Sequence, residues 1–275
     1  MNELYEEMIH NENYEINDYP DVTFIIPAYN EEKRISNVMN DLCNCIHDNN
    51  LKWNIIVSVD GNDNTKNIIN NYSKKYDFIS TDVSKSRSGK GNAIKRALMH
   101  YSSVINDVVI FMDADNSIKF NNILKEIKNI NNNDVIILNR YCKENKIPFL
   151  RRFLGKSFNV MTKGLLRLKI DDTQSGYKIL KKNVVMKEIN KVNLGNAFFD
   201  VSILYHIKKD NYNIKEIDVK YEYDNSTSFH IFKLTIDMFL SIFAFKFRHS
   251  KLYGKIPEKV KVKLLYIYFK RINNE

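Results

Sequence analysis

Short apolar strands alternate with helical segments through the first half of this chain, and this alternation restricts the fold more than any other feature. Runs rich in β-branched and aromatic residues occupy 22–26, 53–59, 78–83, 107–112 and 135–138. Between them, apolar residues recur at helical spacing, most clearly in a helix expected over 32–47. A strand about every 25–30 residues predicts a doubly wound α/β domain, with a mixed, mainly parallel sheet and helices on both faces.

Polar clusters follow four of the expected strands at the point where each strand ends. They are Pro27–Glu31, Asp60–Asp63, Asp113–Asp115 and Asn139–Arg140. Because the carboxyl ends of parallel strands meet in one crevice, we expect these clusters to lie together at a ligand site. Asp113 and Asp115 flank a single alanine, and carboxylates this close favour a divalent cation that compensates their charge. The alternative for this pair is a polar exit from a strand.

A fifth cluster, Lys85–Gly91, combines three cations and two glycines with the start of a helix expected near Asn92. Glycines allow close approach of the backbone, and helix N-termini and cations favour anions, so the segment suits a phosphate. It lacks the order and spacing of a Walker A loop. The alternative is an exposed basic turn.

The second half of the chain has a different rhythm. Residues 141–157 are polar and basic and include Pro148, which predicts a mobile loop, and helical spacing returns at 158–166. Residues 214–223 alternate as a half-exposed strand does. Residues 229–247 predict an apolar, phenylalanine-rich helix, which either packs on the core or lies on a membrane, or does both with different faces.

The net charge of +9 is unevenly distributed. The first 20 residues carry acidic side chains but no Lys or Arg, and the tail from 246 carries nine Lys and Arg against two acidic residues. Such a tail suits an anionic membrane surface, and the alternative is a solvated, solubilising end. Nucleic-acid binding ranks lower, since no recognised motif accompanies the charge. No apolar run reaches the roughly 20 residues of a membrane-spanning helix, no signal peptide is found, and the three cysteines show no metal or disulfide spacing. We expect a cytoplasmic protein, peripheral at the cytosolic face of a membrane.

Several motifs in order resemble one known family. They are Pro27-Ala28-Tyr29-Asn30-Glu31, Asp60-Gly61, Gly89-Lys90-Gly91-Asn92-Ala93, Asp113-Ala114-Asp115, Asp172-Thr173-Gln174-Ser175-Gly176-Tyr177-Lys178 and Phe198-Phe199-Asp200-Val201 with Leu204-Tyr205. Together they resemble the family 2 glycosyltransferases of the Rossmann-like GT-A fold. Within that family they are most similar to the polyprenyl-phosphate branch, and there to the dolichyl-phosphate glucosyltransferases. The resemblance covers roughly residues 22–250.

On the donor side, the resemblance implies that Pro27, Tyr29 and Glu31 line the nucleoside pocket. It places Asp60 against the uracil edge and Lys90 near the nucleotide. The turn after Asp60 departs from the family pattern, being one residue shorter than the usual Asp-Asp-Gly-Ser form.

The resemblance also implies that Asp113 and Asp115 engage Mg²⁺ or Mn²⁺ on the donor diphosphate. Ser117 stands where mannosyl relatives often have Gln. An oxygen-only site of two Asp, phosphates and water suits either of these ions better than zinc.

On the acceptor side, the resemblance implies that Arg140, with Arg151 or Arg152, binds the acceptor phosphate. It implies that Asp172 and Gln174 face the sugar or the acceptor. A lipid phosphate is largely ionised at neutral pH, so it needs positioning more than it needs a general base. We therefore assign neither Asp172 nor Asp200 as an obligatory base. Either can be structural, and Asp200 is at least as readily an N-terminal helix cap as a catalytic group.

The expected function is inverting transfer of a hexose, with glucose favoured, from a nucleotide-sugar such as UDP-glucose to a polyprenyl (dolichyl-type) phosphate. The alternatives are a same-fold transferase using GDP-mannose or another donor, one using a non-lipid acceptor, and a silent nucleotide-sugar-binding module. Many relatives carry a membrane-spanning segment that is not found here, and peripheral contact would come from the C-terminal helix and basic tail. The expected organisation is an acidic lead-in (1–20), a nucleotide-sugar half (21–117), an acceptor half (118–228), an amphipathic helix (229–250) and a basic tail (251–275).

Overall fold

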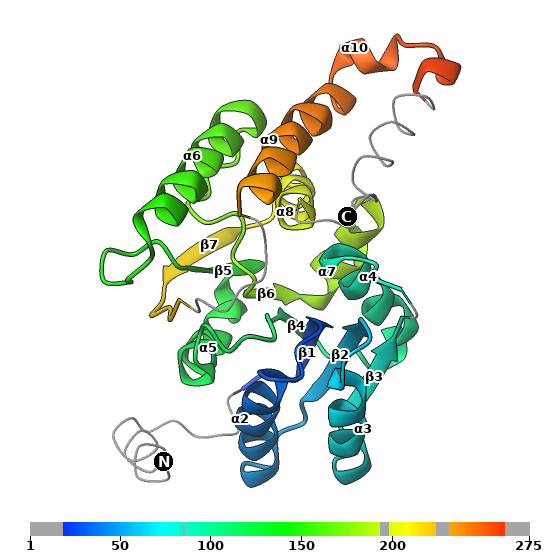
Figure 1. Cartoon of the computed structure of the whole chain (residues 1–275), viewed down its shortest axis with the longest axis vertical. Coiled ribbons are helices and arrows are strands. Elements are labelled where there is room, and N and C mark those ends of the chain that lie inside the picture. Colours follow the sequence, from blue (N-terminus) through cyan, green and yellow to red (C-terminus); the bar gives the residue numbers. More distant parts are fainter. Residues whose placement is uncertain (1–18, 85, 193–197, 224–230, 262–275) are drawn as a thin grey trace.

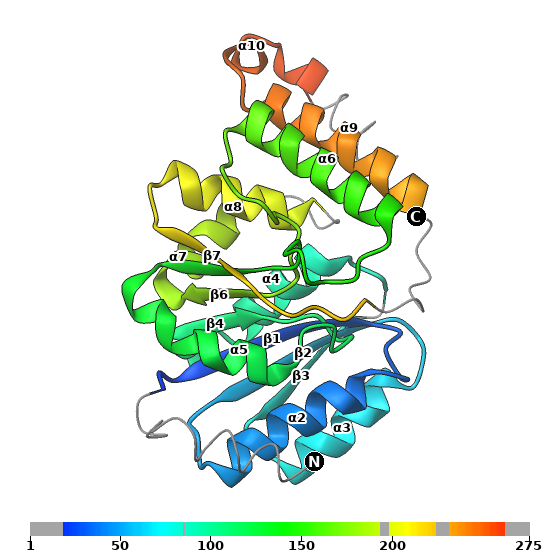
Figure 2. The same cartoon turned by 90° about the vertical axis from the view of Figure 1, so that its left-hand side faces the viewer.

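The computed structural model describes residues 19–84, 86–192, 198–223 and 231–261, with the backbone alone for 231–235. Seven strands form one sheet in the order β3-β2-β1-β4-β6-β5-β7 (Figures 1 and 2). The strands are β1 Val22–Tyr29, β2 Asn54–Asp60, β3 Ile79–Val83, β4 Val108–Phe111, β5 Val135–Asn139, β6 Lys178–Lys181 and β7 Ile214–Asp218. The α-helices are α2 Ile35–Asp48, α3 Thr65–Lys75, α4 Lys90–His100, α5 Phe120–Ile127, α6 Phe149–Leu166, α7 Lys182–Glu188, α8 Phe199–Lys209, α9 Ile231–Arg248 and α10 Lys251–Gly254. The predicted α/β fold is confirmed.

Two apolar cores lie on opposite faces of the sheet, because successive strand residues point to opposite faces. In β1, Phe24 and Ile26 join the core under α2, α3 and α5. Ile25 joins the other core, which α4 and α6 to α9 cover. Both faces are therefore buried, which explains why the central strands are nearly continuous apolar runs.

The strand β1 runs through Pro27, where the sequence predicted its end. Pro27 lies opposite Ser58 of β2 in the parallel register. The backbone carbonyl of Ile25 accepts a hydrogen bond from the Met112 N–H, so the backbone polar groups of Ile25 point toward β4. Alternate residues of a strand point their backbone groups to the same side, so those of Pro27 also point toward β4. Pairing with β4 ends at Ile25–Phe111, so the missing N–H of Pro27 leaves no ladder bond unmade.

The strand β6 was not predicted, and it is antiparallel to both of its neighbours. Lys178 pairs with Phe111 of β4 and with Ile137 of β5. In the described residues, β6 is the only strand that joins the β1–β4 part of the sheet to β5 and β7. Because it runs in the opposite direction, the residues that precede it reach the edge where the parallel strands end.

Three further boundaries differ from the sequence predictions. The helix α6 begins at Phe149, so only the first part of the expected mobile loop at 141–157 is loop. Its helical start follows Pro148, whose fixed φ suits the position before a first turn. The strand β7 ends at Asp218, before the end of the alternating pattern, and the expected lead-in at 1–20 lies almost wholly outside the described residues.

None of the helices in the described part of the chain is both long and apolar enough to span a bilayer. The three cysteines are free thiols, with Cys43 and Cys45 buried in α2.

Candidate active site

The site lies at the carboxyl edge of the sheet, where β1, β2, β4 and β5 end and β6 begins. Asp113 and Asp115 follow β4, and Lys90 opens α4. The Lys90 Nζ donates to Asp113 Oδ1 at 2.9 Å, and the backbone N–H of Ser117 donates to Asp115 Oδ1 at 3.0 Å. The structure thus brings the predicted basic cluster and the predicted carboxylate pair into direct contact.

The Asp113 side chain fits tightly against the segment that leads into β6. An ideal Cβ on Gly176 would lie 1.6 Å from Asp113 Oδ2, so only glycine allows this approach. The Tyr177 hydroxyl also donates to the Asp113 carbonyl at 3.4 Å. The Gln174–Lys178 motif, in the second half of the chain, therefore supports the carboxylate pair.

The carboxylate pair fits a divalent cation that arrives with a phosphate ligand. Burial raises the pKa of Asp115 above its usual value, and the Asp113 carboxylate raises it further, so an added cation would relieve the pair. Among the described residues, no group of three or more His, Cys, Asp or Glu side chains could hold a metal. An ion here would take its other ligands from water and phosphate oxygens, as Mg²⁺ commonly does.

Two buried charged side chains, Asp200 and its partner Lys178, hold Lys90 in place. The Asp200 carboxylate lies 3.4 Å from Lys90 Nζ and 2.6 Å from Lys178 Nζ, and Lys178 is fully buried. Burial alone would raise the pKa of Asp200, but Lys178 and Lys90 lower it below its usual value. The N-cap of α8 is Phe198, so Asp200 does not cap the helix, which was one of the two roles left open for it. Its carboxylate instead contacts Lys90 and Lys178.

A second charge network fixes the end of β2 and the start of the basic cluster. The Asp60 carboxylate accepts from the Ser88 backbone and hydroxyl, both at 2.7 Å, and from Arg96 at 3.0 Å. Arg96 also binds Asp82 at 2.5 Å. The structure places Asp60, which was predicted to meet the base, in a buried internal network, and a base contact by this residue stays a prediction.

The residues predicted for the nucleoside pocket lie at and just beyond the end of β1. Tyr29 is 40% exposed, and the Arg87 guanidinium lies over its ring at 4.6 Å. Glu31 forms a two-point ion pair with Arg34, with both contacts at 2.8 Å. Burial raises the pKa of Glu31 above its usual value, Arg34 opposes this, and the site carboxylates add to the rise. An open aromatic ring beside a guanidinium suits stacking with a flat base.

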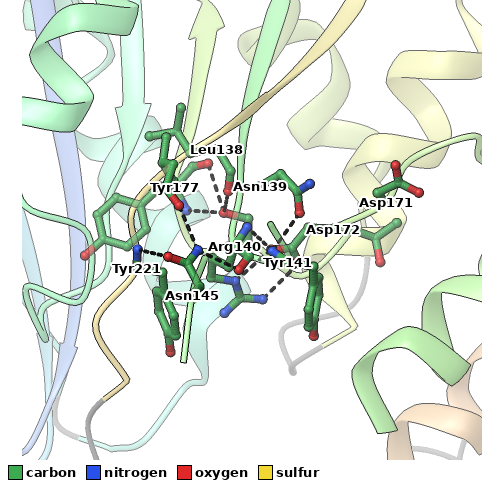
Figure 3. Close-up of polar contacts among 12 residues, drawn as sticks. Leu138, Asn139, Arg140, Tyr141, Asn145, Asp171, Asp172, Tyr177 and Tyr221 are labelled. Carbon is green, nitrogen blue, oxygen red and sulfur yellow. Dashed lines mark hydrogen bonds and ion pairs between the residues drawn. The ribbon is translucent and has the colours of Figure 1, made fainter. Parts of the chain in front are cut away.

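Arg140, which was predicted to bind the acceptor phosphate, forms a two-point ion pair with Asp172 (Figure 3). Its Nε and Nη2 donate to the Asp172 carboxylate at 2.8 and 2.9 Å. Asp172 is fully buried and paired with Arg140, and a contact of its carboxylate with the sugar or the acceptor stays a prediction. Burial opposes the charge on Arg140, but Asp172 raises its pKa well above the usual value, so Arg140 stays charged. Its remaining N–H groups can still bind a phosphate.

Aromatic rings hold this arginine on both sides. The Arg140 guanidinium lies 5.9 Å from the Tyr141 ring and 5.6 Å from the Tyr221 ring (Figure 3). Asn145 links the loop that follows to β7, because its amide donates to the carbonyls of Arg140 and Val219, both at 2.8 Å.

The other predicted acceptor residues lie at the first turn of α6 and before β6. Arg151 stacks over the Tyr223 ring at 4.8 Å and donates to its hydroxyl at 3.1 Å. Arg152 instead donates to the carbonyls of Cys142 and Asn145, which is a structural contact. Gln174 is half-buried and donates to the Met238 sulfur at 3.2 Å.

Sequence reasoning did not find four residues that organise this site. They are Lys178, Arg96, Tyr221 and Tyr223. Lys178 lay inside a quoted motif, and both tyrosines lay on one side of the alternating 214–223 segment, so a signal was present for three of them. Arg96 looks like an ordinary solvated helix cation, and only the β2–α4 packing reveals its partners.

A doubly wound sheet with a carboxylate pair and a basic helix start at its ligand-binding edge is the arrangement of the GT-A glycosyltransferases. A profile of glycosyl transferase family 2 matches residues 23–189. The chain therefore belongs to glycosyl transferase family 2 and is a glycosyltransferase, as the resemblance implied.

The chain is also similar to curated relatives. A dolichyl-phosphate beta-glucosyltransferase from Trichomonas vaginalis is 27% identical over 238 residues, which cover 79% of this chain and 71% of that protein. The enzyme of the same name from Dictyostelium discoideum is 26% identical, with 83% and 74% covered.

Solved structures share the fold at low sequence identity. Glucosyl-3-phosphoglycerate synthase from Mycobacterium tuberculosis, in complex with Mn²⁺, UDP and glucosyl-3-phosphoglycerate, superposes with a TM-score of 0.60 at 13% identity over 85% of each chain. Mannosyl-3-phosphoglycerate synthase from Rubrobacter xylanophilus gives a TM-score of 0.54 at 13% identity, over 87% of this chain and 77% of that one.

Proposed function

We propose that this glycosyltransferase moves glucose from UDP-glucose to a dolichyl-type polyprenyl phosphate and forms a β-linked product. The observation that carries the proposal is that two separate groups of charged side chains lie at the same edge of the sheet. Asp113, Asp115 and Lys90 form the first, and Arg140 and Arg151 supply two cations to the second. The names of the curated relatives support the lipid phosphate acceptor and the β-linkage.

At the donor centre, Asp113 and Asp115 would hold Mg²⁺ or Mn²⁺, which stabilises the charge on the departing diphosphate. The metal-bearing M. tuberculosis structure supports a divalent ion for this fold. Lys90 is held by Asp113 and Asp200, so its ammonium is fixed before substrate arrives and can neutralise a phosphate oxygen without reorganisation. Tyr29 would stack with the base.

At the acceptor centre, Arg140 would bind the lipid phosphate with the N–H groups that Asp172 leaves free. A phosphate oxygen then attacks C1 of glucose, the bond from C1 to the diphosphate oxygen breaks, and UDP leaves. The acceptor oxygen is already ionised, so no side chain has to remove a proton. Attack from the face opposite the leaving group inverts an α-linked donor to a β-linked product.

The test incubates the purified full chain with labelled UDP-glucose, polyprenyl phosphate and Mn²⁺, and counts label extracted into organic solvent. We expect lipid-linked glucose that is lost with EDTA and reduced by at least about 10²-fold in Asp115→Asn. Asp48→Asn, which changes an exposed carboxylate at the end of α2, is the matched control. Transfer from GDP-mannose alone would replace the donor assignment, and lipid-linked sugar from no donor would refute the proposal.

The chain would act at the cytosolic face of a membrane, where the acceptor phosphate is presented. We also propose that residues 21–117 bind the donor and that residues 118–228 bind the acceptor. The contacts of Lys90 with Asp113 and Asp200 support it, because they join the two halves at the point of transfer.

A further inference from the structure

Helices α6 and α9 lie side by side on the outer layer of the molecule, away from the sheet (Figures 1 and 2). Each buries one side in the core beneath it, through Phe158 and Leu166 of α6 and through Met238, Ile242 and Phe245 of α9. Their outward sides are also apolar, which water-facing helices of a folded domain usually avoid.

The exposed apolar side chains of the described residues concentrate on these two helices. On α6 they include Phe149 (84% exposed), Phe153 (58%) and Val160 (67%), and on α9 they are Ile236, Leu240, Phe243 and Phe247. The α9 positions follow helical spacing and form one stripe. The Phe149 and Phe153 rings stack on each other at 6.3 Å, so the first turn of α6 presents a compact apolar cluster.

Basic side chains surround this surface. The exposed cations on and beside the two helices include Lys143, Lys146, Lys156, Lys163, Lys246, Lys251, Lys255 and Lys259, against the exposed acids Glu144, Asp171 and Glu258. Of these lysines, Lys163 is paired with Asp171. An apolar face bordered by lysines is the combination that binds an anionic lipid surface, because the rings enter the acyl boundary and the cations meet the headgroups.

Both helices also touch the acceptor side of the site. Arg151 belongs to the first turn of α6. The Tyr141 ring flanks Arg140, and the Tyr141 hydroxyl packs against Gly155 of α6. This contact is so close that a Cβ on Gly155 would lie 1.9 Å from the hydroxyl oxygen. Gln174 contacts Met238 of α9. A membrane bound to this surface would therefore hold its headgroup phosphates at the level of the acceptor arginines.

We propose that α6 and α9 form a membrane-binding surface for an anionic bilayer, in which Phe149 and Phe153 insert and set the depth of the acceptor site. This rests on the proposed function, because the acceptor is taken to be a lipid phosphate. It adds α6 to the C-terminal helix that the sequence indicated, and it gives the contact a role in alignment as well as in attachment.

The test measures flotation of the purified full chain with phosphatidylcholine vesicles that contain or lack phosphatidylserine, with no donor present. We expect binding that rises with phosphatidylserine, and a loss of at least about tenfold in the Phe149→Ser/Phe153→Ser double variant. The matched control is Met99→Ser/Val104→Ser, which changes two exposed apolar residues of α4 and the turn after it and should bind as the native chain does. Thermal unfolding checks that each variant is folded.

Separate readouts distinguish this proposal from the proposed function. Asp115→Asn should bind vesicles normally and transfer no sugar, whereas the double phenylalanine variant should still glucosylate a short-chain polyprenyl phosphate in detergent. Native-like vesicle binding by the double variant would overturn the surface assignment. A native chain that binds neither type of vesicle would also overturn it. If that chain forms a dimer and the two phenylalanine substitutions dissociate it, the surface joins two copies of the chain instead.

Discussion

Replacing Gly176 with alanine tests whether the carboxylate pair is placed by the segment that enters β6. The new Cβ would lie 1.6 Å from Asp113 Oδ2 and 2.1 Å from its Cγ. Contacts shorter than 3.0 Å do not occur for real Cβ atoms, so Asp113 must move by at least about 1.4 Å. A shift of that size breaks the 2.9 Å ion pair with Lys90 and misplaces a proposed metal ligand.

The expected cost falls on the rate. A displacement of about 1 Å in a reacting site can lower the rate about 10²-fold, so we expect kcat/KM to fall by about 10²- to 10³-fold, or about 3–4 kcal/mol. Folding should suffer little, because the Asp113 side chain is 31% exposed and a partly exposed ion pair contributes about 1 kcal/mol or less.

The assay is glucosyl transfer over a Mn²⁺ titration, with urea unfolding measured on the same preparations. Gly164→Ala is the matched control, since a Cβ at this α6 position meets nothing within 4 Å. It should leave the rate unchanged and raise stability by up to about 1 kcal/mol. A Gly176→Ala protein with the native rate and the native Mn²⁺ dependence would refute this reasoning.

Three further changes probe the buried charges. Burial alone would raise the pKa of Asp82, but hydrogen bonds from Ser58, His100 and Arg96 lower it below its usual value. Its stabilisation is therefore fully present above about pH 4 and falls as the pH drops toward the lower folded pKa. Asp82→Asn should cost about 1–3 kcal/mol in urea unfolding at pH 7 and progressively less below about pH 4, and a cost that does not change with pH would contradict this. Lys178→Met leaves Asp200 paired with Lys90 alone, so the free energy of unfolding should fall by about 3 kcal/mol. Adding Asp200→Leu to this variant should restore part of that loss, and an unchanged urea midpoint in Lys178→Met would count against the network. Arg140→Lys cannot reproduce the two-point pair with Asp172, so the acceptor KM should rise about tenfold with native Mn²⁺ dependence, and an unaltered acceptor KM would exclude the proposed role.

The α/β fold was predictable because its signals are local. Apolar runs that end in polar residues mark strand ends within a few positions, and the central strands fit this pattern since both faces of the sheet are buried. The convergence of the strand-end clusters followed from the same pattern. The Asn62 backbone N–H donates to the Asn30 side chain at 3.2 Å, and this contact joins two of these clusters.

Other features depend on contacts that no window of sequence contains. The strand β6 has four residues, and its partners β4 and β5 lie well before it in the chain. The partner of Asp200 is Lys178, which only the placement of β6 beside α8 reveals. The start of α6 was missed because Pro148 and several basic residues look like loop, although a proline immediately before a helix is compatible with it.

The position of β6 also has a consequence for the order of folding during synthesis. Residues 22–111 can pair as β3-β2-β1-β4 as soon as they leave the ribosome, but the free edge of β4 stays uncovered until residues 178–181 follow. Until then β5 has no place in the same sheet, because its link to β4 is β6. An unpaired apolar edge is a site of aggregation, so a chain stopped before β6 should aggregate. Released chains that end at 170 and at 192 should differ sharply in protease resistance, because only the longer one contains β6.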